Sequence, residues 1–335
     1  MVNVGMKDVV ATESDISRID GEEGILEYRG YSIHDLAKHS SYEETAFLLL
    51  HGHLPTKKEL DEFTRDLAKR RRIPPEVIGL LSSLPSITHP MVVLRTAISY
   101  CGSLDENLHV ITPEENLEKS KEIVAMFPTI IAYTYRMREG KQLINPREDL
   151  SHAANFLYML KGKEPSELEE RALDTDLILH AEHTLNASTY SSRIAASTKS
   201  DMYAGIVSAT GTLMGPLHGG ASQAVIEMIK EIKNGDETPK EYIKRKLEEG
   251  ELIPGFGHRV YKTIDPRAKE LKKLAKELDQ TKNSDWCVIS EEIEEAVKSE
   301  RNLYPNVDFY AASVYSDLNI PDDFFIPIFG MGSLP

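Results

Sequence analysis

Apolar residues recur at helical spacing through most of this chain, usually behind a side chain that can cap a helix N-terminus. Thr56 and Glu59 form a capping box, and the helix behind them is expected to end before Pro74. Ser166 and Glu169 form a second box at the start of another helix. Because each box satisfies backbone N–H groups that a helix leaves unpaired, the pattern predicts a mainly α-helical protein.

Further helices are predicted from a proline placed just after a capping residue or at a helix start. One spans residues 112–139, with a kink expected at Pro128, and two others begin at Asp265 and at Pro305. Residues 202–214 are rich in Ala, Gly, Ser and Thr. Since small residues allow helices to approach closely, we interpret this segment as a central buried helix.

The clearest β signal is a hairpin over Arg18–Tyr31, in which the turn-forming residues 20–24 separate two short segments. The charged stretch 230–251 is predicted to be a solvated helical face with its loops. No internal repeat or low-complexity linker interrupts the chain. The predicted fold class is therefore all-α, with one short N-terminal β-hairpin.

Bulk properties limit the class of protein further. With 335 residues and 41% hydrophobic content, the chain can bury a large core in one domain or two. No apolar run approaches the ~20 residues that cross a bilayer, and residues 1–11 lack the apolar stretch of a secretion signal. The only cysteines, Cys101 and Cys287, are expected to be reduced. We therefore expect a cytoplasmic protein with no membrane segment.

The net charge of −15 argues against a nucleic-acid partner, because phosphate binding needs a basic surface. Anionic substrates would then require a local basic cluster. Residues 254–267 supply one, since a glycine-rich loop brings together His258, Arg259, Lys262 and Arg267. Arg267 would stand at the second position of a helix, against the helix dipole, which suggests an anionic partner. The alternative is a solvated basic loop.

A second cluster is the hexapeptide Gly215-Pro216-Leu217-His218-Gly219-Gly220, which precedes a well-patterned helix. Its glycines would let a ligand approach the backbone closely. A helix N-terminus disfavours imidazolium, so His218 is predicted to be a neutral hydrogen-bond donor. The alternative is a buried loop histidine bonded to backbone.

Two more clusters could be functional, but each could also be an ordinary helix terminus. His183 opens the sequence His-Thr-Leu-Asn-Ala-Ser-Thr, whose polar tail fits a helix end. Asp308 lies in the first turn of a helix, where the dipole favours its charged form and partial burial would raise its basicity. His180 and His183 could suggest a zinc pair, but no third ligand is evident, so no metal is expected.

These four clusters, in this order and spacing, resemble the citrate synthase family. The most specific matches are the hexapeptide around His218 and Gly-Phe-Gly-His-Arg-Val-Tyr-Lys with Asp-Pro-Arg around His258. The resemblance runs from the hairpin to about Phe329 and covers nearly the whole chain. It implies a multi-helical homodimer whose active site lies in a cleft between two domains.

The domain boundaries follow from the same match. The resemblance implies a large domain over residues 1–220, completed by residues 320–335, and a small domain over residues 221–319 that carries elements of the CoA and citrate site. It also implies that the two domains close over oxaloacetate. Closure would exclude water from a reactive enol.

The resemblance implies condensation of acetyl-CoA with oxaloacetate, followed by hydrolysis of citryl-CoA to citrate and CoA. Asp308 matches the base that removes a methyl proton from acetyl-CoA. His218 matches the donor to the thioester oxygen, and His258 matches the residue that polarises the oxaloacetate ketone. His183 and Arg267 match positions that bind oxaloacetate.

The match also assigns CoA-binding positions, which comprise a loop whose backbone surrounds the adenine and basic side chains near the phosphates. They are Ile253, Pro254, Gly255, Gly257, Lys262 and Arg29. Acetyl-CoA acts as a co-substrate in this scheme. No metal and no permanently bound cofactor is required.

Family members continue beyond the segment that matches Ile326–Phe329 and carry two further arginines that bind substrate carboxylates. This sequence reads Gly330–Pro335 there, with Ser333 about where the first arginine is expected. Each missing contact would cost about 1.5–3 kcal/mol, because an arginine pairs with a carboxylate in two parallel hydrogen bonds. The expectation is a shortened or altered form of a longer enzyme, with reduced activity of its own.

Three alternatives stay open at this point. A 2-methylcitrate synthase would use propionyl-CoA with the same residues, and no motif separates it from a citrate synthase. A non-catalytic acyl-CoA or carboxylate-binding protein would keep the fold without turnover. An unrelated helical scaffold or metal-dependent hydrolase would require all four clusters to be coincidental.

Overall fold

The computed structural model describes residues 13–216 and 218–335, so residues 1–12 and Leu217 of the hexapeptide lie outside the described residues. The segment inspected for a secretion signal belongs to that undescribed N-terminus. Within the described ranges, the chain forms sixteen α-helices, a short 3₁₀ helix and three short strands. The predicted mainly helical fold with an N-terminal hairpin is confirmed.

The strands are β1 (Ser17–Asp20), β2 (Ile25–Tyr28) and β3 (Tyr31–Ser32). The first helices are α1 (Ile33–His39), α2 (Tyr42–His51), α3 (Lys57–Arg70), α4 (Pro75–Ser83), α5 (Pro90–Leu104), α6 (Pro113–Arg138), α7 (His152–Lys161) and α8 (Glu167–His180). The remaining helices are α9 (Ala187–Ser197), α10 (Met202–Leu213), α11 (Ala221–Asn234), α12 (Pro239–Glu248), α13 (Pro266–Lys282), α14 (Trp286–Arg301), α15 (Val307–Asp317), η2 (Asp322–Phe324) and α16 (Phe325–Gly332).

Helix starts follow the local signals closely. Thr56 caps α3 and Ser166 caps α8, each in a complete capping box, and Asp265 caps α13 as predicted. Helix α6 continues through Pro128 rather than ending there. The helix expected at Pro305 instead begins at Val307 behind the cap Asn306, because Pro305 forms a β-bridge with Phe256.

The hairpin is antiparallel, with Ser17 opposite Tyr28 and Asp20 opposite Ile25. Its tip packs against the basic loop, more than two hundred residues later in the chain. The Lys262 N–H donates to the Gly21 carbonyl at 2.8 Å. A Cβ on Gly21 would lie 2.2 Å from the Val260 carbonyl oxygen, so only glycine fits this close approach. The N-terminal hairpin therefore fixes one side of the loop.

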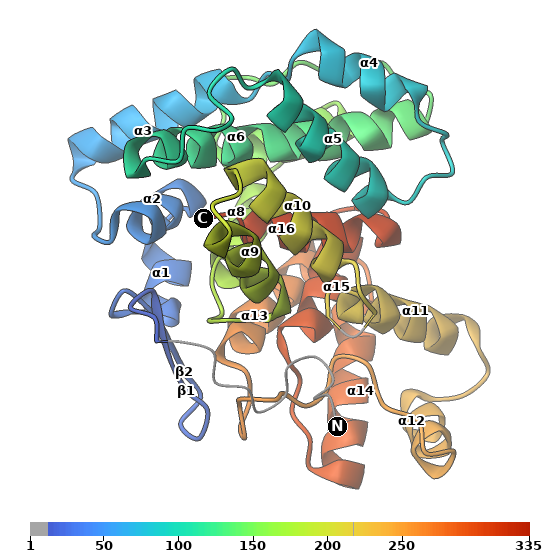
Figure 1. Ribbon diagram of the computed structural model, residues 1–335. Coiled ribbons are helices and arrows are strands. Elements are labelled where there is room, and N and C mark those ends of the chain that lie inside the picture. Colours follow the sequence, from blue (N-terminus) through green and yellow to red (C-terminus); the bar gives the residue numbers. More distant parts are fainter. Residues whose placement is uncertain (1–12, 217) are drawn as a thin grey trace.

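The prediction of a central buried helix at residues 202–214 is wrong. Only four residues of α10 are buried, and α9 has no buried residue. These two helices pack mainly on each other, with α10 also resting on α5 (Figure 1). Ile194 of α9 is 53% exposed. Helix α10 is therefore only partly buried within this protomer, with no exposed residue, and α9 is its more exposed partner.

Helices α11 to α15 pack chiefly on one another, and α11, α12 and α14 lie together at the lower right of Figure 1. Helices α3 to α6 lie at the opposite end. Between them, α8 packs against α16, α13 and α15. The buried apolar side chains of both groups form one continuous core. No helix in the described part of the chain has the length and apolar character to cross a membrane.

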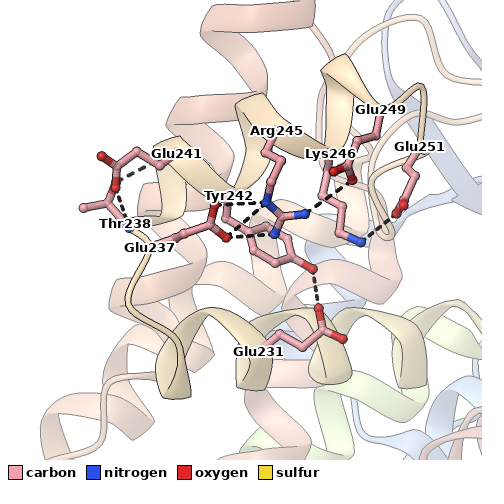
Figure 2. A network of polar contacts seen from close by, with 9 residues as sticks. All are labelled: Glu231, Glu237, Thr238, Glu241, Tyr242, Arg245, Lys246, Glu249 and Glu251. Carbon is pink, nitrogen blue, oxygen red and sulfur yellow. Dashed lines mark hydrogen bonds and ion pairs between the residues drawn. The ribbon is translucent and has the colours of Figure 1, made fainter.

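The charged stretch is solvated as predicted. Helix α12 buries only Tyr242 and Ile243 and presents its charged side chains outward. Figure 2 shows the resulting network, in which Arg245 bonds Glu237 and Glu249 and the Tyr242 hydroxyl donates to Glu231. Helix α12 carries no predicted site residue.

Candidate active site

A buried carboxylate organises the basic loop. Asp265 Oδ1 accepts from the Arg267 backbone N–H and from its Nε, both at 3.0 Å, and Oδ2 accepts from the Arg267 Nη2 at 2.8 Å. Oδ2 also accepts from the Val307 N–H at 3.2 Å. One carboxylate thus joins the start of α13 to the start of α15. The anionic partner predicted for Arg267 is present within the chain, two residues away.

The same charge pair sets the protonation of Asp265. Burial opposes its charge, but the Arg267 guanidinium outweighs burial and lowers the Asp265 pKa to about 2. The carboxylate is therefore ionised at neutral pH. The pKa of Arg267 is raised by the same contact, although burial opposes it.

The loop predicted to surround the adenine is pinned to the segment before Asp308. The Gly257 N–H donates to the Tyr304 carbonyl at 2.9 Å, and the Asn306 N–H donates to the Gly255 carbonyl at 2.9 Å. The Asn306 side chain adds a bond from Nδ2 to the Gly257 carbonyl at 3.1 Å. These bonds bring two motifs that lie about fifty residues apart into one structural unit.

Gly255 shows why this loop needs glycine. Its φ is +80°, and a Cβ there would lie 2.7 Å from Val225 Cγ2 and 2.8 Å from the Phe309 ring. A side chain would therefore be strained and would also collide with the residue after Asp308.

His258 is held in one neutral form. Its Nδ1 accepts from the backbone N–H groups of Val260 and Tyr261, at 3.0 and 3.2 Å. A neutral ring with Nδ1 as acceptor carries its proton on Nε2. Burial and the positive charge of Arg267 lower the His258 pKa to about 4. At neutral pH the ring is therefore uncharged, and its free donor is Nε2–H.

His183 lies beside His258. Their ring centroids are 5.1 Å apart, and His183 Nε2 is 3.3 Å from the Tyr261 hydroxyl. Burial, followed by the charge of Arg267, holds the His183 pKa well below its usual range. The structure thus gathers His183, His258 and Arg267 into one group, as expected for a shared ligand. The predicted helix end after His183 is the start of α9, which Asn186 caps.

His218 stands two residues before Gly220, the cap of α11, so the predicted placement at a helix start is confirmed. Its Nε2 is 2.7 Å from the Ser188 hydroxyl, which comes from the first turn of α9. Burial and, to a lesser degree, Arg259 lower the His218 pKa. His218 is therefore also neutral at physiological pH, like the other two histidines.

Asp308 occupies the first turn of α15, and its backbone N–H donates to the Asn306 side chain at 3.1 Å. Burial raises its pKa to about 6, while the charges of His180 and Arg267 oppose this rise. A carboxyl with such a pKa is ionised at pH 7 yet is a stronger base than a solvated aspartate. At neutral pH, Asp308 is therefore an ionised carboxylate, whereas the imidazoles of His183, His218 and His258 are uncharged.

The remaining predicted CoA residues are more scattered. Lys262 is exposed, next to the hairpin tip. Arg29 lies at the opposite end of β2, where its Nη1 is 3.4 Å from the Asp15 carbonyl and its buried Nε has no hydrogen-bond partner among the described residues. Ile253 is buried, whereas Pro254 is half-buried. The structure does not bring Arg29 beside the Lys262 loop.

Sequence reasoning missed several residues of this site. Ser188 and Tyr261 contact His218 and His183, and Asp265 was taken only as a cap. Both Ser188 and Tyr261 lie inside motifs that were recognised, so their position in the motif was a usable signal. In the described ranges, no three His, Cys, Asp or Glu side chains are placed to hold a metal ion. His180 and His183 bond instead to Asp176 and Tyr261.

Comparison with known proteins shows the family of this chain. Residues 5–335 match the family model described as "Citrate synthase, C-terminal domain". The chain is 47% identical to citrate synthase 2 of Bacillus subtilis over 332 residues, covering 98% of this chain and 88% of that protein. Haloferax volcanii citrate synthase is 45% identical over 332 residues, with the same coverage. A crystal structure of citrate synthase from Thermotoga maritima superposes with a TM-score of 0.89 at 41% identity, covering 100% of this chain and 89% of that one.

The match to the family model and to curated citrate synthases identifies an acyltransferase. The chain belongs to the citrate synthase family. Its reaction is the condensation of acetyl-CoA with oxaloacetate to give citrate and CoA. The alternative of an unrelated scaffold or hydrolase is wrong, and the matches do not favour the 2-methylcitrate alternative.

Proposed function

We propose that this chain forms citrate with Asp308 as the base and with His218 and His258 as neutral hydrogen-bond donors. The observation that carries the proposal is the contrast in protonation. The pKa of Asp308 is raised to about 6, whereas that of His258 is lowered to about 4. Above about pH 6, and so at neutral pH, the Asp308 carboxylate is ionised and can accept a proton, while the His258 imidazole stays uncharged.

The first step requires two groups at once. The methyl proton of a thioester is very weakly acidic, so a carboxylate can remove it only if the developing oxyanion is stabilised together with the transfer. Asp308 takes the proton, and His218 donates to the thioester oxygen. If the Ser188 hydroxyl donates to His218 Nε2, the ring proton resides on Nδ1, which becomes the donor.

The second step joins the enol to oxaloacetate. His258 Nε2–H donates to the ketone oxygen and so draws charge away from the carbon under attack. His183 and Arg267 bind the dicarboxylate. Asp265 occupies Nε and one Nη of the Arg267 guanidinium, and the other donors are directed to a substrate carboxylate. A Thermoplasma acidophilum citrate synthase, which has a TM-score of 0.93 to this structure at 31% identity, forms a ternary complex with carboxymethyl coenzyme A and oxaloacetate. That complex supports the same pair of ligands for this chain.

Acetyl-CoA is the proposed co-substrate, with no resident cofactor. Backbone groups of Ile253 to Gly257 surround the adenine, and Lys262 meets the phosphates. Because Asn306 bonds this loop directly, adenine binding and the position of Asp308 are mechanically linked. Arg29 lies at the end of β2 that is far from the hairpin tip and Lys262. It would contact a CoA phosphate only if the hairpin moved.

The larger assembly is also proposed. Residues 221–319 form the small domain, and residues 1–220 with 320–335 form the large one. Helices α9 and α10 supply the homodimer face, because they bury little within one protomer and carry small residues that permit close helix packing. We place the enzyme in the cytoplasm, in line with its two buried, unpaired cysteines.

A competition experiment tests the substrate assignment. The protein is given oxaloacetate with equal concentrations of acetyl-CoA and propionyl-CoA, and the products are separated by mass spectrometry. Citrate as the main product is expected. A predominance of 2-methylcitrate would overturn the choice of acetyl-CoA, and no condensation product from either would favour a binding protein without turnover.

A further inference from the structure

A buried chain of polar groups runs from α15 to the end of α8. The Tyr315 hydroxyl donates to Asp176 Oδ2 at 2.6 Å. His180, one helical turn after Asp176, forms a hydrogen bond through Nδ1 with the Asp176 carbonyl at 2.9 Å. The same nitrogen is 3.2 Å from Asp176 Oδ1, close enough for an ion pair, and this oxygen has no hydrogen-bond partner among the described residues. Asp176 is 0% exposed and His180 is 3% exposed. No part of the proposed chemistry uses these three residues.

The opposite ring nitrogen of His180 is the unexplained feature. Its Nε2 is buried and has no hydrogen-bond partner among the described residues. Leaving a buried polar nitrogen unpaired is costly, so a retained one calls for a partner in another state of the protein. The surroundings on the other sides are closed, since the Phe329 ring lies 4.6 Å away and Ser333 donates to the His180 carbonyl at 2.7 Å.

The fold places His180 on the side of Asp176 that is nearer to the start of α15. Asp308 and Tyr315 are seven residues apart and so share one face of α15. Helix α8 packs against α15, and Tyr315 meets Asp176 rather than His180. His180 lies one turn beyond Asp176. Three residues further on, His183 contacts Tyr261 of the loop that Asp265 joins to the start of α15. His180 therefore lies on the Asp308 side of Asp176.

We propose that Asp176 and His180 form a buried positioning pair for the base Asp308. Asp176 holds the imidazole through Nδ1 and favours its protonated form, and the Nε2–H group faces the Asp308 carboxylate and stabilises its negative charge. Tyr315 fixes the orientation of Asp176. Neither Asp176 nor His180 touches a substrate, so both act through Asp308. The inference rests on the proposed role of Asp308 as the base.

The charges around both groups agree with this arrangement. Burial opposes protonation of His180, but the Asp176 carboxylate outweighs burial and Arg267, and the His180 pKa is raised. Around Asp308, the charged groups are His180 from α8 and Arg267 and Asp265 from the start of α13. His180 is the strongest of these charges acting on Asp308, and it opposes the effect of burial. Without it, the Asp308 pKa would rise further.

The test is the pH profile of oxaloacetate-dependent CoA release, measured as kcat/KM from about pH 5 to pH 9. The variants are His180→Gln and Asp176→Asn, which remove the charge and keep the approximate shape. His152→Gln is the matched control, because His152 is an equally buried histidine on α7 whose ring nitrogens have no partners. A thermal melt of each variant reports whether it folds. If His180→Gln does not fold, the pH profile of Asp176→Asn decides the test.

Loss of the nearby cation should raise the pKa of Asp308. In both variants the acidic limb of the kcat/KM profile should therefore move up by about one pH unit, with little change in kcat/KM on the plateau at higher pH. The limb should stay in place in His152→Gln. An unmoved limb, or an equal movement in His152→Gln, overturns the inference. Asp308→Asn separates it from the proposed function. If that variant keeps full activity, the base assignment itself fails; if it is inactive while the limb of Asp176→Asn is unmoved, only the positioning pair fails.

Discussion

The carboxylate of Asp265 offers the sharpest test of how the site is held together. It accepts four hydrogen bonds, three from Arg267 and one from the Val307 backbone. Its side chain is 0% exposed and that of Arg267 is 4% exposed. Asp265→Asn keeps the shape but removes the charge. It also turns an amide N–H₂ towards groups that are themselves donors.

Two estimates give the size of the effect. Removing one partner of a buried ion pair costs about 3–5 kcal/mol, because the other charge stays buried and unpaired. Independently, lowering the Asp265 pKa from 3.8 to about 2 corresponds to roughly 2–3 kcal/mol of stability. Since the folded pKa is lowered, this contribution is present above about pH 4 and is lost as the pH falls through about 2. We therefore expect Asp265→Asn to lose about 3 kcal/mol at pH 7.

Urea unfolding at pH 7 measures this loss. Glu237→Gln is the matched control, because Glu237 also binds an arginine through several hydrogen bonds but on the exposed surface of α12 (Figure 2). Water screens that pair, so its unfolding midpoint should hardly move. Equal small losses in both variants would refute the view that Asp265 and Arg267 hold the two segments together.

Other residues give separate expectations. CoA release should fall below about pH 6, because Asp308 must be ionised to act as a base; an acidic limb near pH 4 would contradict its raised pKa. Ser188→Ala should lower kcat about tenfold with an unchanged melting temperature, since it frees the His218 ring without emptying the core; an unchanged kcat would exclude Ser188 as its orienting partner. Gly255→Ala should cost about 2–4 kcal/mol in urea unfolding through strain and collision with Phe309, and a neutral result would refute that tight fit.

Local signals in the sequence were enough to find the starts of several helices. A cap such as Thr56, Ser166 or Asp265 acts on backbone groups two or three residues away, so its effect can be predicted from neighbours alone. Pro305 shows the limit of that reasoning. Its backbone is held by a bridge to Phe256, forty-nine residues earlier, and this delays the helix to Val307.

Burial was predicted less well, because it depends on what covers a helix rather than on the helix itself. The small residues of α10 fit a close helix contact, but within one protomer only α5 and α9 supply extensive contacts. In the candidate site, the motifs around His218, His258 and Asp308 were recognised from residue types. Their protonation states were not predictable in full, because Asp265, Arg267 and His180 act across long gaps in the chain.

Thiol release from acetyl-CoA, measured with and without oxaloacetate, tests the central claim most directly. The wild-type chain and Asp308→Asn are compared at pH 8, where Asp308 is fully ionised. We expect release by the wild-type protein only when oxaloacetate is present, and a loss of at least ~10²-fold in the variant. Release that ignores oxaloacetate, or that survives the loss of the Asp308 carboxylate, would contradict a citrate-forming condensation driven by this base.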